Sequence, residues 1–245
     1  MNTSEKVKYI SNWIKSYVDQ MPSKAQSLVV GISGGIDSSV SSTLSAMTGL
    51  RTIVLSMPIK QKENQHDLSL KHQAWLVKNF KNVEAHTISL DNLFESFSST
   101  LGKFNNEHGF ANSRARLRMA TLYQVAAANK GIVVGTGNKV EDFGVGFYTK
   151  YGDGGVDISP IADCNKTEIW ELGKELGILK EIIDAPPTDG LWDDGRTDEG
   201  QLGFKYKDLE DAMANPDSPH KTEYEKIRKQ NLHKMEPIPV CKIPS

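Results

Sequence analysis

The sequence predicts an α/β fold, a doubly wound parallel sheet with helices on both faces. Four short apolar runs, each about one strand long, alternate with longer segments whose apolar residues recur at helical spacing. The runs are continuous rather than alternating with polar residues, which is typical of strands buried on both faces of a parallel sheet. Ligands bind at the carboxyl ends of the strands in such sheets, so we expect the functional residues to follow the strands.

The first half of the chain is expected to alternate helix and strand three times, over residues 4–20, 27–33, 38–47, 51–58, 64–80 and 83–90. Residues 4–20 place Val7, Ile10 and Ile14 at helical spacing on one face. Gly49 is expected to stop the second helix, and Pro58 to close the second strand.

The second half is expected to add a helix, a strand and a further helix, over residues 111–130, 132–136 and 165–178. The first helix has Asn112 or Ser113 as its expected cap and Gly131 as its stop. Asn165 is a good cap for the last helix, with Glu168 at capping-box spacing from it. Three long connections are rich in glycine or acidic residues, 102–111, 137–163 and 185–203. Long loops in a compact domain are usually functional or disordered.

The composition bounds the class of protein. The chain has 245 residues, of which 38% are hydrophobic and 24% charged, as in ordinary globular proteins, and we expect a single domain over residues 1–245. A formal charge of -2 argues against a nucleic-acid partner. Two cysteines, Cys164 and Cys241, provide no disulfide framework. Without a signal-peptide pattern or a run of about 18 apolar residues, we expect a cytoplasmic protein with no membrane partner.

A loop of small residues, GISGGIDS from Gly31 to Ser38, follows the first strand. A glycine-rich turn into a helix presents backbone N–H groups and the positive end of the helix dipole to an anion. No lysine follows Gly35 as in a P-loop, and the spacing does not fit the dinucleotide fingerprint. Asp37 would repel a phosphate unless a cation lay between them. We therefore interpret the loop as a phosphate site in which Asp37 is a Mg²⁺ ligand.

The string from Ser33 to Ser38 resembles the pyrophosphate loop of the N-type ATP pyrophosphatases, which cleave ATP between the α and β phosphates and have the adenine nucleotide alpha hydrolase-like fold. Other strings resemble the NAD synthetases of that superfamily over nearly the whole chain, namely NSRARLRM, GTGNKVEDFGVGFYTKYGDGGVDISPIADCNKTEIWELGKELG, PPTDGLWDDGRTDEGQLGF and HKMEP. The resemblance implies ATP-dependent amidation of deamido-NAD to NAD through an adenylated intermediate, with release of AMP and pyrophosphate. Because the loop begins by residue 33, no glutaminase domain fits before it, and we expect ammonia to be the nitrogen source.

The resemblance also implies a role for individual residues. The implied ATP-binding positions are Gly31, Ile32, Ser33, Gly34, Gly35, Ile36, Asp37, Ser38, Thr136, Lys166 and Thr188. The implied deamido-NAD-binding positions are Arg116, Lys150, Asp157, His233 and Lys234. Asp37 and Glu141 are the implied Mg²⁺ ligands. Asp157 and Lys166 are the expected catalytic residues, Asp157 as a candidate base for ammonium and Lys166 as a cation on an ATP phosphate.

Helical geometry separates Arg116 from its neighbours. Each residue advances about 100°, so Arg114 and Arg118 share a face while Arg116 points about 200° around the helix from Arg114. Arg116 matches the family's substrate-binding arginine, and Arg114 and Arg118 are expected to be surface or dimer-interface charges. Asn112 is a further candidate for substrate contact.

Residues 185–203 are expected to form a mobile lid loop, because an acyl adenylate must be kept from water. Trp192 is the candidate anchor of this lid, whereas Asp198 and Glu199 match the family string without an assignable role. The resemblance further implies a homodimer, to which the helices over 4–20 and 112–130 are expected to contribute.

Two alternatives stay open at this point. A tRNA-modifying adenylating enzyme of the same loop class would be expected to carry a basic flank or an extra domain, and neither is visible. A nucleotide-binding sensor would use the loop without turnover. Release of AMP and pyrophosphate with ATP, Mg²⁺, deamido-NAD and ammonium would distinguish a synthetase from both.

Overall fold

The computed structural model describes residues 1–60, 63–188, 191 and 197–244. In these residues four parallel strands form one sheet, in the order β3-β2-β1-β4. The strands are β1 (Ser27–Gly31), β2 (Thr52–Ser56), β3 (Val83–Thr87) and β4 (Gly131–Val134). In the register of the sheet, Leu28 of β1 lies beside Thr52 on one side and Ile132 on the other. The expected parallel sheet is therefore confirmed, with each strand where the sequence predicts it.

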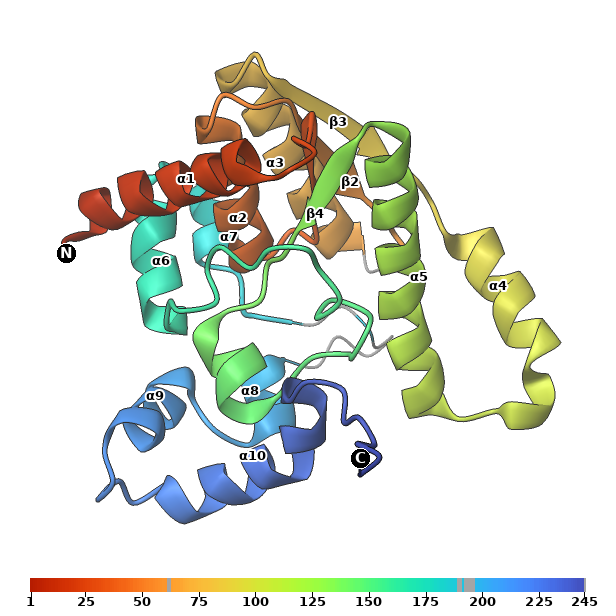
Figure 1. Cartoon of the computed structure of the whole chain (residues 1–245), viewed down its shortest axis with the longest axis vertical. Coiled ribbons are helices and arrows are strands. Elements are labelled where there is room, and N and C mark those ends of the chain that lie inside the picture. The colour runs from red at the N-terminus through yellow and green to blue at the C-terminus, as the bar shows by residue number, and fades with distance from the viewer. Residues whose placement is uncertain (61–62, 189–190, 192–196, 245) are drawn as a thin grey trace.

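Helices cover both faces of the sheet (Figure 1). One layer contains α1 (Thr3–Gln20), α2 (Ile36–Met47), α3 (Glu63–Asn79), α6 (Lys166–Glu175) and α7 (Lys180–Ile183). The opposite layer contains α4 (Asp91–Thr100) and α5 (Glu107–Ala128). Leu28 and Val30 of β1 are buried in the core of the first layer, whereas Val29 between them is buried in the core of the second. Because successive side chains of a strand point to opposite faces, this alternation explains why the strand sequence is apolar throughout.

A third group of helices follows the sheet, α8 (Asp198–Leu202), α9 (Tyr206–Ala214) and α10 (Lys221–Met235). These helices pack against a π-helical turn, η2 (Lys139–Val145), through an apolar cluster that includes Val140, Leu209 and Tyr224. Neither this group nor α4, α7 and the short 3₁₀ helix η1 (Gly102–Phe104) is anticipated from the sequence pattern. No helix among the described residues has the length and apolar character of a membrane span.

The start and end of α5 differ from the prediction. The helix begins at Glu107, and its cap is Asn106, whose Oδ1 accepts from the backbone N–H of Gly109 at 2.7 Å, so the assignment of Asn112 or Ser113 as the cap is wrong. Residues 102–111 are consequently not a long loop. Gly131 does not stop the helix but begins β4, where a Cβ atom would lie 2.8 Å from the backbone oxygen of the paired strand. The capping box at the start of α6 is confirmed.

Candidate active site

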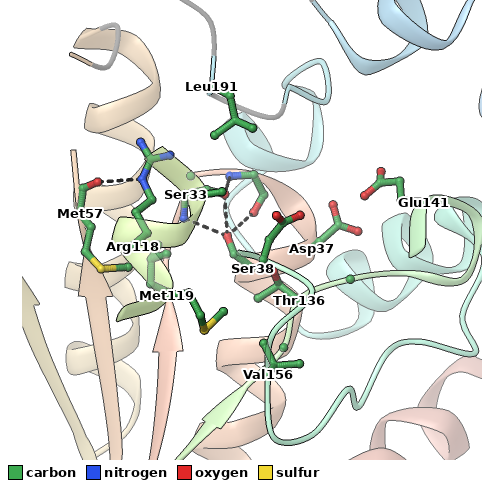
Figure 2. A pocket seen from close by; sticks show the side chains of 18 of the residues that line it. Ser33, Asp37, Ser38, Met57, Arg118, Met119, Thr136, Glu141, Val156 and Leu191 are labelled. Carbon is green, nitrogen blue, oxygen red and sulfur yellow. Dashed lines mark hydrogen bonds between the residues drawn. The ribbon is translucent and has the colours of Figure 1, made fainter. Parts of the chain in front are cut away.

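A cavity of about 240 Å³ lies at the carboxyl ends of the strands (Figure 2). One part of its wall is apolar, with Met57, Met119, Leu122 and Val156. The other part is polar, and it contains Ser33, Gly34, Gly35, Asp37, Ser38, Thr136, Glu141, Asp142, Asp153, Thr188 and Asp198. A pocket with an apolar half and a few converging polar groups is suited to a ligand that has a ring at one end and charge at the other.

The small-residue loop between β1 and α2 forms the polar floor. Gly34 has φ +92°, a left-handed conformation that favours glycine, and Gly35 is the N-cap of α2. The Ser38 hydroxyl donates to the carbonyl of Gly35 at 3.1 Å and accepts from the backbone N–H of Ser33 at 3.2 Å, which holds the turn closed. Gly31, Ile32 and the loop residues line the cavity, except that the Ile36 side chain, 3% exposed, packs into the core beside α6.

Asp37 of α2, Glu141 of η2 and Lys166 of α6 meet at the edge of this floor. Lys166 Nζ lies 2.6 Å from Asp37 Oδ2 and 2.9 Å from Glu141 Oε1, and the lysine side chain is 1% exposed. Asn138 donates to Asp37 Oδ1 at 3.0 Å while its own Oδ1 caps the first turn of η2. Figure 2 shows the two carboxylates side by side on the cavity wall. Three residues distant in sequence are thus brought into one charged cluster.

The electrostatics of this cluster follow from burial and charge. Burial raises the pKa of Asp37 above its ordinary value although Lys166 opposes the shift. Burial acts in the same sense on Glu141, but the Lys166 ammonium and the Tyr206 hydroxyl bring the pKa of that carboxyl below its ordinary value. Burial alone would lower the pKa of Lys166, but the two carboxylates raise it, so the lysine is a permanent cation.

The donor set fits Mg²⁺. Asp37 and Glu141 present carboxylate oxygens to the cavity, and Mg²⁺ is usually held by one or two carboxylates that are completed by substrate phosphates and water. Within the described ranges, no group of three or more His, Cys, Asp or Glu side chains is arranged as a metal site. An ion here would therefore depend on a bound nucleotide for the rest of its ligands.

Several polar cavity residues escape the sequence-based assignment, among them Asp142, Asp153 and Arg118. Burial and the nearby Asp153, Glu141 and Asp37 raise the pKa of Asp142 well above its ordinary range. Arg118 lines the cavity, and its Nε donates to the Met57 carbonyl at 3.0 Å.

The expectation that Arg114 and Arg118 are surface charges is wrong. Arg114 is 9% exposed, and its Nη1 donates to the Leu191 carbonyl at 2.7 Å. Arg114, Arg118 and Leu122 are each four residues apart, and Leu122 belongs to the core, so the two arginines continue the face of α5 that meets the sheet. The apolar Leu122, four residues after Arg118, is the signal in the sequence that could have placed both arginines on the buried face of the helix.

The residues expected at the second substrate lie in two places. The exposed Arg116 donates through Nε to the Lys150 carbonyl at 3.2 Å, and Lys150 Nζ donates to the His233 carbonyl at 3.3 Å, so α5, the 150 loop and α10 are side by side. Lys234 Nζ donates to the Tyr148 carbonyl at 2.9 Å.

Asp157 is held elsewhere. Its Oδ2 accepts from the backbone N–H of Val133 at 2.7 Å, and its Oδ1 accepts from the Tyr123 hydroxyl at 3.0 Å. Asp157 is not among the residues that line the cavity.

Cys164 is buried and its pKa is raised to about 11, chiefly by burial, which suits an unreactive thiol. Trp192, the expected lid anchor, lies outside the described residues.

The fold and the cavity define a class of protein: an α/β nucleotide-binding enzyme with the adenine nucleotide alpha hydrolase-like fold. The family model of NAD synthase matches residues 6–243, and the chain belongs to that family. The reaction of the family is the ATP-dependent amidation of deamido-NAD, and its enzymes are ligases that form a carbon–nitrogen bond.

Two curated relatives carry the name of this family. The chain is 37% identical to the NH(3)-dependent NAD(+) synthetase of Carboxydothermus hydrogenoformans, over 86% of this chain and 85% of that protein. It is 35% identical to the enzyme of the same name from Alkaliphilus oremlandii, over 99% and 98%. Among solved structures, an NMN synthetase from Francisella tularensis superposes with a TM-score of 0.91 at 32% identity, covering 99% of this chain and 100% of that one. An NH3-dependent NAD synthetase from Campylobacter jejuni, 24% identical with a TM-score of 0.80 over 99% and 100%, shows the same fold.

Proposed function

We propose that this chain converts deamido-NAD to NAD with ATP and ammonia, and that the cavity at the carboxyl ends of the strands is the site of the reaction. The observation that carries the proposal is the convergence of the glycine–serine loop, Asp37 and Glu141 on one wall of the cavity, with Lys166 behind that wall in contact with both carboxylates. A carboxylate resists attack by ammonia, so it must first be activated. An oxygen of the nicotinate carboxylate attacks the α-phosphorus and pyrophosphate leaves; ammonia then attacks the carboxyl carbon, AMP leaves, and a proton is lost to give the amide.

Different residues of the site serve the adenylation step, which is the first half of this reaction. The backbone N–H groups of the loop and the N-terminus of α2 are suited to hold the phosphates. Asp37 and Glu141 would hold Mg²⁺, which when bound supplies positive charge to the departing pyrophosphate. Lys166 is the nearby cation that we assign to an ATP phosphate, and the remaining ATP contacts are assigned to Thr136 and Thr188 on the cavity wall.

We assign the second substrate to Arg116, Lys150, His233 and Lys234. The contacts from Arg116 to Lys150 and from Lys150 to His233, and the contact of Lys234 with Tyr148 near Lys150, support a common site. We keep Asp157 as a contact of deamido-NAD, but both of its oxygens already accept hydrogen bonds, so its assignment as the base for ammonium has no support in these contacts. The 185–203 segment is proposed to close over the nucleotides and exclude water from the adenylate.

The proposal is tested by incubating the purified protein with ATP, Mg²⁺, deamido-NAD and ammonium, and by measuring AMP, pyrophosphate and NAD. Equal amounts of the three products are expected, with none when deamido-NAD is omitted. Binding of ATP without AMP release would support a sensor instead, and release that needs tRNA would support the tRNA-modifying alternative.

A second candidate substrate is nicotinate mononucleotide, which would give NMN. The full-length superposition on the Francisella tularensis NMN synthetase favours it. The mononucleotide carries the same carboxylate and differs by the missing AMP half, so the same chemistry would serve both. Equimolar competition between the two substrates, with NMN and NAD quantified by mass spectrometry, decides between them. An excess of NMN would overturn our first assignment.

We further propose that the enzyme is a cytoplasmic homodimer. Tyr9, Trp13 and Tyr17 are exposed at successive four-residue steps along α1, and Tyr123 is exposed on α5. Exposed aromatic side chains are enriched at protein interfaces, which supports a contact through these helices. Light scattering at micromolar protein concentration should give twice the 27.1 kDa chain mass. A monomeric mass would count against the dimer.

A further inference from the structure

The C-terminal helices reach the charged cluster through Tyr206, the first residue of α9. Its side chain is 1% exposed, and its hydroxyl donates to Glu141 Oε1 at 2.6 Å. The Trp170 ring meets the Tyr206 ring edge-on, with centroids 6.0 Å apart, and Lys166 Nζ lies 4.8 Å from the Tyr206 ring centroid. One aromatic side chain therefore contacts two of the three charged residues of the cluster.

The hydroxyl proton is directed to Glu141 rather than to its other neighbour. A tyrosine hydroxyl has one proton to donate. Asp198 Oδ2 lies 3.3 Å from the hydroxyl, whereas Glu141 Oε1 lies at 2.6 Å, so Glu141 receives the stronger bond. A hydrogen bond from a neutral donor to an ionised acceptor is stronger than one between neutral groups.

The backbone around Tyr206 is also fixed. Glu199 of α8 accepts the backbone N–H of Tyr206 through Oε1 at 3.0 Å, which ties the start of α9 to the helix before it. This contact gives Glu199 a structural role. The neighbouring Asp198 lies in the cavity wall beside the Tyr206 hydroxyl. The segment from α8 to α9 thus places the hydroxyl where Glu141 needs a donor.

We propose that Tyr206 is a positioning residue that holds the Glu141 carboxylate in the orientation required for metal binding. Glu141 Oε1 receives both the Tyr206 hydroxyl and the Lys166 ammonium, and two donors on one oxygen fix the rotation of the carboxylate. Without the hydroxyl, the carboxylate samples further orientations and must be ordered again whenever the ion binds. The inference rests on the proposed function, because it takes Glu141 as a ligand of the nucleotide-bound ion.

The experiment compares Tyr206→Phe with Tyr224→Phe. Tyr206→Phe keeps the ring that packs on Trp170 and removes the hydroxyl. Tyr224→Phe makes the same change at another buried tyrosine of the C-terminal cluster, in α10. Binding of Mn²⁺ to the full-length protein with a non-hydrolysable ATP analogue is measured by the loss of the free Mn²⁺ signal in electron paramagnetic resonance, and the Mg²⁺ requirement of turnover is measured separately.

Tyr206→Phe is expected to weaken Mn²⁺ binding and to raise the half-saturating Mg²⁺ concentration by about tenfold, which is the size expected for one hydrogen bond to a charged acceptor. Its kcat should recover at saturating Mg²⁺, and Tyr224→Phe should match the wild type in both measurements. Unchanged metal affinity in Tyr206→Phe, or an equal loss in Tyr224→Phe, overturns the inference.

Glu141→Gln separates this inference from the proposed function. If Glu141→Gln does not weaken Mn²⁺ binding, the proposed metal site itself is wrong. If Glu141→Gln weakens binding and Tyr206→Phe does not, only the role of Tyr206 is lost. In the double variant, Tyr206→Phe should add little to the effect of Glu141→Gln, because both act through one carboxylate.

Discussion

Lys166→Met removes the ammonium that lies between Asp37 and Glu141. The lysine is 1% exposed and its Nζ contacts both carboxylates within 3 Å. Methionine has a similar length and no charge, so the variant leaves two partly buried carboxylates facing each other. The perturbation is therefore electrostatic, with little change in the volume that the side chain fills.

The expected loss of stability is large. Removing one partner of a buried ion pair typically destabilises a protein by about 3–5 kcal/mol, because the remaining charge stays buried without compensation. For a chain of this size, each kcal/mol lowers the midpoint of thermal unfolding by about 2–4 °C, so we expect a decrease of about 6–20 °C. A proton can relieve the repulsion between the carboxylates. Like charge raises their folded pKa, so the deficit should be largest at high pH and should shrink as the pH falls.

Urea unfolding and thermal melts at about pH 8 and pH 5.5 measure these effects. Lys180→Met is the matched control, since Lys180 also pairs with an aspartate but its side chain is 84% exposed. Exposed pairs contribute little, and this control should stay within about 0.5 kcal/mol of the wild type. Adding Glu141→Gln to Lys166→Met should restore part of the loss. Equal stability of Lys166→Met and Lys180→Met at pH 8 would show that the buried ion pairs contribute no more to the free energy of unfolding than the exposed pair, which would refute the reasoning.

Three further predictions concern other positions. Asp37→Asn should retain the fold, as judged by circular dichroism, and lower the rate of AMP release by a factor on the order of 10²; near-normal turnover would refute the metal assignment. Burial lowers the pKa of His72 from 6.5 to about 4, so the unfolded chain takes up this proton first as the pH falls. Between pH 6.5 and about pH 5 the wild type should lose about 1.5 kcal/mol of unfolding free energy relative to His72→Gln, and parallel pH profiles in urea unfolding would contradict this. Gly131→Ala should destabilise by about 1–3 kcal/mol in the same assay, because its Cβ would lie 2.8 Å from the backbone oxygen of Ser27. Gly102→Ala, where an added Cβ meets no described atom within 4 Å, should stay within about 0.5 kcal/mol, and equal losses in the two variants would refute the steric argument.

The sheet and the glycine–serine loop after its first strand could be predicted because their signals are local. Each strand is a short apolar run, and the loop combines glycines, serines and Asp37 within eight residues. The structure extends β1 over Ser27–Gly31, within the predicted run, and starts α2 at Ile36, inside the loop string and ahead of the predicted start at Ser38. Local composition also sets the capping box of α6, which is confirmed.

The C-terminal helices could not be predicted in the same way. Tyr224 is the buried residue of α10, whose surface is otherwise largely polar, so its amphipathic pattern is weak. The role of Tyr206 depends on a contact with Glu141, 65 residues earlier, and no spacing rule connects the two positions. Arg118 was misassigned for a related reason, because its face of α5 is defined by the sheet against which the helix packs.

The acidic character of the cavity extends beyond the glycine–serine loop. The described wall holds five carboxyl groups, those of Asp37, Glu141, Asp142, Asp153 and Asp198, and Arg118 is the cation among its side chains, with Lys166 immediately behind. Burial favours the neutral form of some of these groups, Asp142 above all, but a metal-free triphosphate would still meet ionised carboxyl groups and few cations there. We therefore expect the wall to favour a nucleotide that arrives with a divalent cation, because the repulsion inferred from Asp37 extends to the other ionised carboxyl groups of the wall. Since the Tyr206 hydroxyl contacts this acidic wall, we expect the orientation of Glu141 to set how well the wall binds a metal ion that accompanies the nucleotide.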